Sequence, residues 1–254
     1  MPRFIVRPDQ LHDPEVILSE KESRHALSAL RLKVGAAVDL MDGQGHLVQG
    51  IIGAVKEGRV RVIANQNRTA DHPSAKARVT LAVSVIKSER MEWLIEKSCE
   101  LGVSAIVPIL TERSVIRMSR ERWQSRLVRW RKIASESCKQ CGLVVIPAVE
   151  EPVMFQKFLG SLNRFGLVFI PTLAVAGESL LVSYLRLKSA APPNILGLIG
   201  PEGDFTKSEV AAAISNGAKP VSLGALTLRS ETAALYFLSA VNFFYQEMTN
   251  EKIL

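Results

Sequence analysis

Cysteine and histidine are scarce in this chain of 254 residues, which contains three of the first and four of the second. An odd number of cysteines argues against a disulfide framework. Cys138 and Cys141 form a C-x-x-C pair, but only Cys99 could join them, whereas a zinc site takes four ligands. No histidine follows His72. We therefore expect no metal site, and we expect reduced, packed cysteines.

A long apolar run is also missing. The most apolar helical stretch, residues 233–245, is interrupted by Ser239 and Asn242, and it is shorter than the about 20 residues that a membrane-spanning helix needs. Residues 1–7 indicate a first strand and not a secretory signal. These absences predict a cytoplasmic protein without a membrane partner.

The chain does have enough apolar residues, 47%, to bury a core, and it carries a net charge of +7. Eight basic residues crowd into residues 113–132, where Glu121 is the only acid. Three of them share one face of a predicted helix, and we call them the arginine stripe: Arg122, Arg126 and Arg129. The stripe is either an ordinary solvated surface or a binding face for a polyanion. Trp123, Leu127 and Trp130 repeat the spacing one position along and predict the face that packs.

Hydrophobic periodicity divides the chain in two. Residues 1–73 show short strands and tight turns, with a helix at residues 20–32, and residues 65–75 are polar enough to be a linker. Residues 74–254 alternate strands and helices, which predicts an α/β domain. We expect its strands at residues 79–86, 105–110, 144–149, 167–170, 195–199 and 221–223, and its helices at residues 91–101, 120–138, 155–162, 178–187, after 206 and from 230.

Near the C-terminus, strand, glycine loop and helix follow one another twice. The first loop is GPEG at residues 200–203, before the capping-box pair Thr206 and Glu209; the second spans residues 224–229. In an α/β sheet, ligands bind outside the carboxyl ends of the strands. The first loop has neither the dinucleotide nor the P-loop pattern. Its glycines favour close approach of the main chain to a flat, weakly charged ligand such as an adenosine.

Both loops resemble the RsmE family of ribosomal RNA methyltransferases, which are knotted α/β enzymes of the SPOUT class. The similar segments are GPEG at residues 200–203, LG at 223–224 and LRSETA at 228–233. KSER at 87–90, EKSCELGV at 96–103 and TERS at 111–114 resemble the family's central signature, and RH at 24–25 with LRLKVG at 30–35 its N-terminal part. Nearly the whole chain is covered, in order.

The resemblance implies a PUA-like RNA-binding β-barrel in residues 1–73, a methyltransferase domain with a trefoil knot in residues 74–254, and a homodimer. It implies S-adenosylmethionine (SAM) as methyl donor and N3 of a uridine, family position 1498, in 16S rRNA of the small ribosomal subunit as acceptor. By similarity, the cofactor residues are Pro171, Thr172, Ile199, Gly200, Pro201, Gly203, Leu223, Gly224, Leu226, Leu228 and Glu231. The RNA-binding candidates are Arg3, Arg7, Arg24, His25, Arg31, Lys33 and the arginine stripe.

Within this resemblance, Arg229 and Glu202 are the catalytic candidates. Negative charge that develops on the uracil carbonyls would be stabilised by a preorganised donor, and Arg229 is our candidate for it. It cannot be the base, because a guanidinium stays protonated. Glu202 or Glu231 takes the proton or orients the base; the alternative is structural, since the macrodipole favours a glutamate in a first helical turn. His25 contacts RNA or packs a short helix.

The chain departs from the family pattern at three places. Asp204 stands where the family usually has glycine, Leu226 where it has arginine, and Lys139-Gln140 leads to Leu143 where it has Glu-Gln and then arginine. These departures leave two rival hypotheses open. One is an RNA-binding protein of the same fold without catalysis; the other is a SPOUT methyltransferase that acts on another RNA position, such as a ribose hydroxyl.

Overall fold

A computed structural model describes residues 1–69, 78–114, 119–173 and 194–250. Contacts divide the chain into two compact units: Met1–Ser74 with Ser135–Ile146, and Ala75–Ala134 with Pro147–Leu254. The second segment of the first unit comes from the region that we assigned to the methyltransferase domain. The domain boundary at residues 73 and 74 stays a prediction, and the helix expected at residues 178–187 lies outside the described residues.

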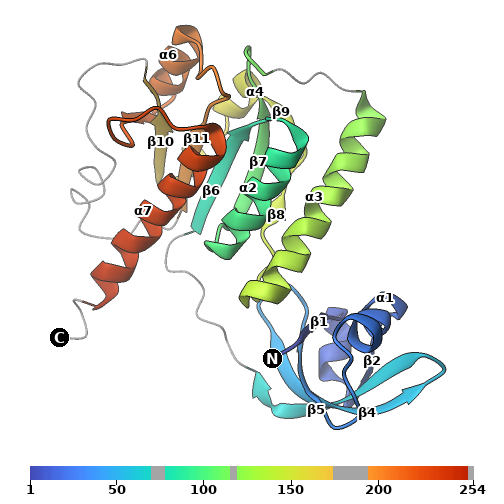
Figure 1. Cartoon of the computed structure of the whole chain (residues 1–254). Helices are drawn as coiled ribbons and strands as arrows, with labels where there is room; N and C mark the ends of the chain where they lie inside the picture. The colour runs from blue at the N-terminus through green and yellow to red at the C-terminus, as the bar shows by residue number, and fades with distance from the viewer. Residues whose placement is uncertain (70–77, 115–118, 174–193, 251–254) are drawn as a thin grey trace. The chain divides into compact units, whose positions relative to one another are not determined.

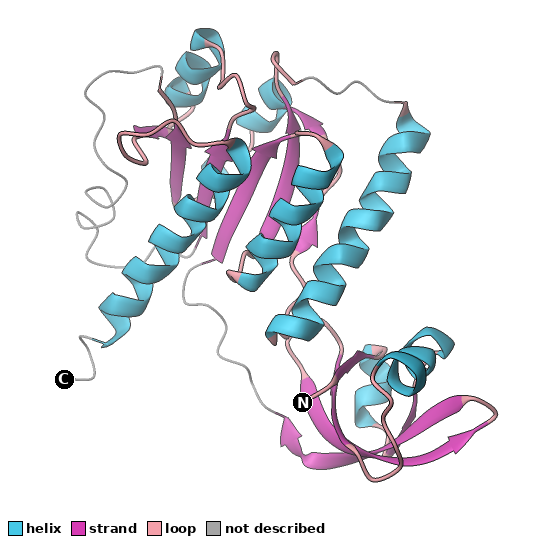
Figure 2. Cartoon of the chain, viewed as in Figure 1, coloured by secondary structure: helices cyan, strands magenta, loops and turns pink. Residues whose placement is uncertain are grey.

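The N-terminal unit is a curled five-stranded sheet (Figures 1 and 2). Its strand order is β1 (Arg3–Ile5), β3 (Ala37–Met41), β4 (Leu47–Lys56), β5 (Arg59–Thr69) and β2 (Glu15–Ile17). Glu57 and Gly58 have φ angles of 51° and 72°, the left-handed pair that a tight two-residue hairpin requires. Residues 65–69, which we expected in a linker, belong to β5, because that strand continues to Thr69.

The helix that we expected at residues 20–32 is shorter and changes form. Helix α1 (Glu20–Arg24) is capped by the Ser19 hydroxyl, which accepts from the Glu22 N–H at 3.2 Å, and a π-helical turn continues it over His25–Ala29. Ala26 is buried in the core of this unit, whereas Leu30 is exposed. The helix thus ends where its apolar face stops meeting the sheet.

A buried ion pair holds Ser135–Ile146 in the N-terminal unit. Lys139 Nζ lies 3.1 Å from Glu22 Oε1 and 2.6 Å from Glu136 Oε2, and the side chains of Lys139 and Glu22 are only 8% and 7% exposed. Arg3 pairs with Asp39 at 3.4 Å and donates to the Lys139 carbonyl at 3.3 Å. The departure at Lys139 therefore has a structural partner within this unit.

The second unit is a twisted, parallel α/β sheet (Figure 1). Its strand order is β12 (Lys219–Val221), β10 (Leu167–Pro171), β11 (Asn194–Ile199), β6 (Arg78–Ser84), β7 (Ala105–Leu110) and β8 (Ala148–Val149), with β9 (Val153–Met154) also on β7. Its helices are α2 (Ser88–Glu100), α3 (Arg120–Cys141, which ends in the first unit), α4 (Phe155–Leu159), α6 (Lys207–Ser215) and α7 (Ser230–Asn250).

Two predicted strands differ from the observed ones. The strand expected at residues 144–149 is only Ala148–Val149, because Val145 bridges to Gln44 and Ile146 N–H donates to Gly43 in the N-terminal unit. The last strand lies at Lys219–Val221 and not at residues 221–223. In both cases the apolar run extends beyond the residues that pair within this sheet.

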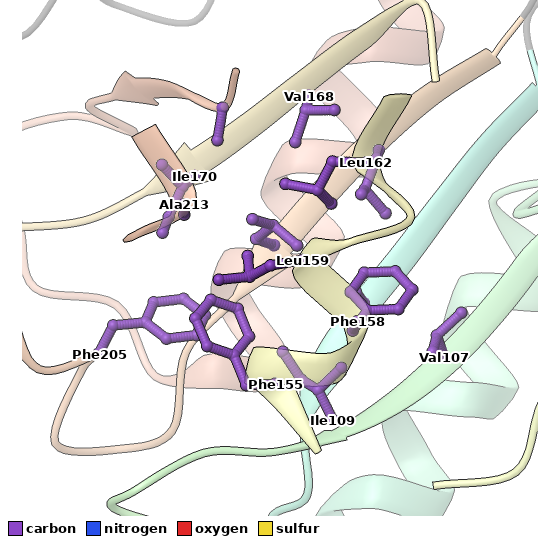
Figure 3. Close-up of a cluster of buried hydrophobic side chains, with 14 of the residues drawn as sticks. Val107, Ile109, Phe155, Phe158, Leu159, Leu162, Val168, Ile170, Phe205 and Ala213 are labelled. Atoms are coloured by element: carbon purple, nitrogen blue, oxygen red, sulfur yellow. The ribbon is translucent and has the colours of Figure 1, made fainter. Parts of the chain in front are cut away.

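The sheet is covered on both faces. Leu196 and Leu198 of β11 belong to the core that α4 and α6 share, where the rings of Phe155 and Phe205 lie 5.0 Å apart (Figure 3). Because side chains alternate along a strand, the residue between these leucines faces the other side. Gly197 does so and lies against Phe237 of α7. Among the described helices, none is long and apolar enough to cross a membrane.

Candidate functional site

The loops after β10, β11 and β12 meet around one cavity of about 300 Å³. The three strands are parallel neighbours, so their carboxyl ends lie at the same edge of the sheet. All but one of the eleven predicted cofactor residues line this cavity, and the exception is Glu231. Glu202, the catalytic candidate, also lines it. The structure thus brings together the two loops that the sequence singled out.

Several lining residues were not predicted: Leu173, Asp204, Ser222, Thr227, Ser230 and Ala233. Ser230 and Ala233 belong to the LRSETA segment and begin α7, so the segment itself was the signal. The Ser230 hydroxyl is buried without a hydrogen-bond partner among the described residues. A buried polar group of this kind is expected to have a partner, which suits a site that takes a ligand.

The loop after β12 is shaped by its own hydrogen bonds. The Ser222 hydroxyl accepts from the Gly224 N–H and donates to the Gly224 carbonyl, both at 3.2 Å. Gly224 has a φ of 122°, a backbone conformation that residues other than glycine rarely adopt. This turn directs the following residues, Leu226 and Leu228, along the cavity wall.

Asp204 joins the loop after β11 to the loop after β10. Its Oδ2 accepts from the Thr172 hydroxyl at 2.9 Å and from the Leu173 N–H at 3.0 Å, while Oδ1 accepts from the Phe205 N–H at 2.7 Å. Its φ is 56°, in the left-handed region where glycine is most at ease. This conformation explains why a glycine suits the position. The aspartate adds the three hydrogen bonds, of which those from Thr172 and Leu173 tie the two loops together.

The central signature reaches the same loops. The predicted capping box at the start of α6 is present, since Thr206 and Glu209 exchange hydrogen bonds. Glu209 is 1% exposed, and its Oε1 also accepts from the Glu112 N–H at 2.9 Å. Arg113 donates to the Gly203 carbonyl. Within the TERS segment, residue 113 therefore holds the GPEG loop, and residue 112 holds the start of α6.

Arg90 of the KSER segment lies between the two candidate glutamates. Its Nη1 is 3.3 Å from Glu202 Oε1, and its Nε is 3.8 Å from Glu231 Oε1. Glu231 is 8% exposed, and its Oε2 is buried without a hydrogen-bond partner among the described residues. Arg229, one residue before α7, is exposed and is not part of the cavity wall. The KSER motif pointed to Arg90 but not to its role, because its partners lie far along the chain.

The RNA-binding candidates of the N-terminal unit differ in their surroundings. Arg31 and Lys33 are exposed, and Arg31 has a φ of 51°. Arg24 is exposed and pairs with Glu20 at 2.6 Å. The His25 ring lies edge-on to Phe4, with ring centroids 6.4 Å apart, and is partly exposed; its contact with RNA stays a prediction. The remaining two are Arg3, which has the buried partners described above, and Arg7, which pairs with Asp9 at 3.1 Å.

The arginine stripe lies on α3, within the second unit. Arg122 and Arg129 are exposed, and Arg129 forms an ion pair with Glu92 at 2.7 Å, whereas Arg126 is half-buried. The adjacent face packs as predicted, with Leu127 and Trp130 buried.

Of the cysteine pair, Cys138 is buried and Cys141 exposed. The described residues contain no group of three or more His, Cys, Asp or Glu side chains arranged to hold a metal.

A parallel α/β sheet with a cavity at the carboxyl edge of its strands, in a chain with a second, curled β unit, defines a two-part α/β protein. The chain belongs to the RNA methyltransferase domain family, whose model matches residues 73–242, and an RNA methyltransferase PUA domain matches residues 18–64. These matches confirm the predicted kinship and fold class. They do not bear on the trefoil knot, which stays a prediction.

Relatives and solved structures agree with this assignment. The chain is 29% identical to ribosomal RNA small subunit methyltransferase E of Synechocystis sp., over 94% of this chain and 77% of the relative. It resembles the structure of the Neisseria gonorrhoeae enzyme of the same name bound to SAM, with a TM-score of 0.84, 28% identity and coverage of 96% and 97%. The chain also resembles the structure of a Legionella pneumophila methyltransferase with bound SAM. The TM-score is 0.85 and the identity 29%, over 95% of this chain and 96% of the other.

Proposed function

We propose that this RNA methyltransferase uses SAM to methylate N3 of one uridine in the 16S rRNA of the small ribosomal subunit, in the cytoplasm. The observation that carries this proposal is the single cavity that both glycine loops line. Support comes from relatives named for the small subunit's rRNA and from similar structures solved with SAM. The uridine at family position 1498 is the expected target.

The cavity suits the cofactor chemically. Its loops offer main-chain donors and acceptors beside apolar side chains such as Ile199, Leu223 and Leu228, the combination that small-molecule sites use. Its volume is at the lower end of the usual range of about 300–1,000 Å³. The cofactor would supply an electrophilic methyl group on a sulfonium. The residues that hold it in our proposal are the ten predicted ones that line the cavity.

The chain's own residues would orient the uracil and manage its proton. Arg229 directly precedes α7 and lies between the lining residues Leu228 and Ser230 in the sequence. It can donate to a uracil carbonyl as negative charge develops there. Glu202 is the candidate proton acceptor, because it lines the cavity and is exposed, whereas Glu231 is buried. Positioning of this kind supplies about 7–11 kcal/mol in well-oriented reactions.

RNA contacts are assigned to exposed cations of both units. In our proposal, Arg24, Arg31 and Lys33 present the positive charge of the N-terminal unit, and the arginine stripe presents that of the second unit. Such cations give affinity that depends on salt and not on sequence. Arg3 supports RNA binding in our proposal by stabilising the N-terminal unit through Asp39 and the Lys139 carbonyl.

We propose that the protein is a homodimer and that its chain is knotted. Tyr236 and Phe243 of α7 are seven residues apart, share a helix face and are 51% and 65% exposed. In our proposal, this face of α7 contributes to the contact with the second subunit. After the edge strand β12, the chain returns over β11 and β6 as helix α7. In our proposal, this return path is part of the knot. Analytical ultracentrifugation tests the dimer.

Transfer of tritium from methyl-labelled SAM to small subunits that lack the modification tests the function. The proposal expects incorporation at N3 of a single uridine, located by nuclease digestion and mass spectrometry. Absence of incorporation, with RNA binding intact, would leave only a binding protein of this fold. Label on a ribose hydroxyl would assign the enzyme to a different reaction.

The variant Arg229→Ala tests the catalytic assignment. We expect the turnover number to fall by at least about a hundredfold, the usual cost of losing one such donor, while the dissociation constant of SAM changes little. An equal loss of turnover and cofactor affinity would mean that Arg229 organises the loop and does not stabilise developing charge.

A further inference from the structure

The described charged side chains of the cavity wall all have the same sign. Among the described residues that line it, the charged side chains are Glu202 and Asp204, and no lysine, arginine or histidine lines it. Two carboxylates without a lining cation make a wall that favours a positively charged ligand. The two carboxylates differ, however, in how their charge is balanced.

Glu202 has a counterion, and Asp204 has none among the described residues. Arg90 lies 3.3 Å from Glu202. Asp204 is instead held by the three neutral donors described above, the Thr172 hydroxyl and two main-chain N–H groups. Arg113 is close, but it donates to the main-chain carbonyls of Gly203 and Asp204 and not to the carboxylate. Neutral donors hold the carboxylate in place without cancelling its charge.

The backbone at Asp204 is in a conformation that is less favourable for aspartate than for glycine. A φ of 56° puts a residue with a Cβ in the left-handed region, where aspartate is tolerated less well than glycine. Strain of this kind persists where the surrounding structure fixes it and often accompanies function. Asp204 is half-buried in the wall, so a bound ligand would shield its charge from solvent.

We propose that Asp204 makes the cavity prefer the sulfonium form of the cofactor over the neutral thioether that remains after methyl transfer. The inference rests on the proposed function, since it assumes that SAM binds in this cavity. Methyl transfer moves the C–S bonding pair onto sulfur, so the positive charge at sulfur disappears. The carboxylate then loses its attraction, and the product, S-adenosylhomocysteine, is released more readily than it would be from a neutral wall.

Titration calorimetry with both ligands tests the proposal. The quantity of interest is the dissociation constant of S-adenosylhomocysteine divided by that of SAM, which cancels losses that a variant imposes on both ligands. Asp204→Asn keeps the size of the side chain and removes its charge. We expect the ratio to fall by about threefold to tenfold, the range for one charge pair in partly solvated surroundings. Raising the salt concentration should lower the wild-type ratio toward that of the variant.

Two further variants separate charge from structure. Thr172→Val removes a donor to Asp204 and keeps the charge, so both dissociation constants should rise together and the ratio should stay at the wild-type value. Asp204→Gly relieves the left-handed strain and covers the case in which the asparagine variant does not fold; its ratio should fall as well. An unchanged ratio in a folded Asp204 variant would overturn the proposal while leaving the enzyme assignment intact. Failure of wild-type protein to bind either ligand would refute the proposed function itself.

Discussion

Substituting Gly197 by alanine should loosen the contact between α7 and the sheet. A Cβ at this position would lie 2.5 Å from Cε1 of Phe237, 2.8 Å from Cδ1 and 3.0 Å from Cζ. Phe237 is fully buried and packs on Phe169, with ring centroids 6.0 Å apart. Carbon atoms prefer separations of about 3.5–4.0 Å, so the ring must retreat by about 1 Å into occupied space.

The expected loss is that of an overpacked core, about 1–3 kcal/mol in the free energy of unfolding. A functional loss should accompany it. Ala233 and Ser230 lie four and seven residues before Phe237, on the same side of α7, and both line the cavity. A shift of the helix would displace them, and we expect the dissociation constant of SAM to rise.

Urea denaturation and calorimetry measure the two effects. Gly160→Ala is the matched control, because its Cβ would meet its nearest atom at 3.6 Å and its φ is −64°; it should cost nothing. Phe237→Leu alone leaves a cavity and destabilises, but combined with Gly197→Ala it should recover at least about 1 kcal/mol relative to the sum of the single changes. Strictly additive losses, or a Gly197→Ala variant as stable as wild type, would refute this account of the contact.

Three other predictions concern charge. Lys139→Met should lower the free energy of unfolding by about 3–5 kcal/mol, because it leaves Glu22 buried without its cation; urea denaturation checks this, and a loss below about 1 kcal/mol would contradict it. Burial raises the pKa of Glu136, but hydrogen bonds and charge from Lys139 and Lys21 outweigh it and hold that pKa below its usual 4.5. The group therefore stabilises the fold above pH 4.5 and ceases to do so as pH falls through the lowered pKa; the stability difference between wild type and Glu136→Gln should shrink over that window, and a difference independent of pH would exclude the mechanism. Changing the arginine stripe to glutamine should weaken RNA binding and flatten its salt dependence, whereas an unchanged slope in filter binding would return the stripe to the solvated-surface interpretation.

Sequence reasoning located the cavity because its signals are local. Glycine loops after apolar runs mark strand ends, and parallel strands place their ends at one edge, so the two glycine loops could be grouped without coordinates. The ten cofactor candidates that line the cavity came from the resemblance to the RsmE family. The capping box of Thr206 and Glu209 was visible for the same reason. Its second use, the hydrogen bond from the Glu112 N–H, was not, because that contact depends on how β7 and β11 are placed.

The failures share one cause, which is that pattern does not specify a partner. The apolar residues 144–149 suggested one strand of the α/β sheet, yet Val145 and Ile146 pair with the N-terminal unit. Asp204 could be read only as a departure until its φ and its three donors were known. Arg90 was noticed in a motif without a role, since the two glutamates it meets are more than a hundred residues away.

A crystal structure of the protein with SAM is the most direct test of the central claim, that the loops after β10, β11 and β12 form the methyl donor's site. The account predicts cofactor density within the cavity between residues 171–173, 199–204 and 222–228, with the methyl group open toward Glu202 and Arg229. Density for bound SAM at any other place on the chain would contradict it.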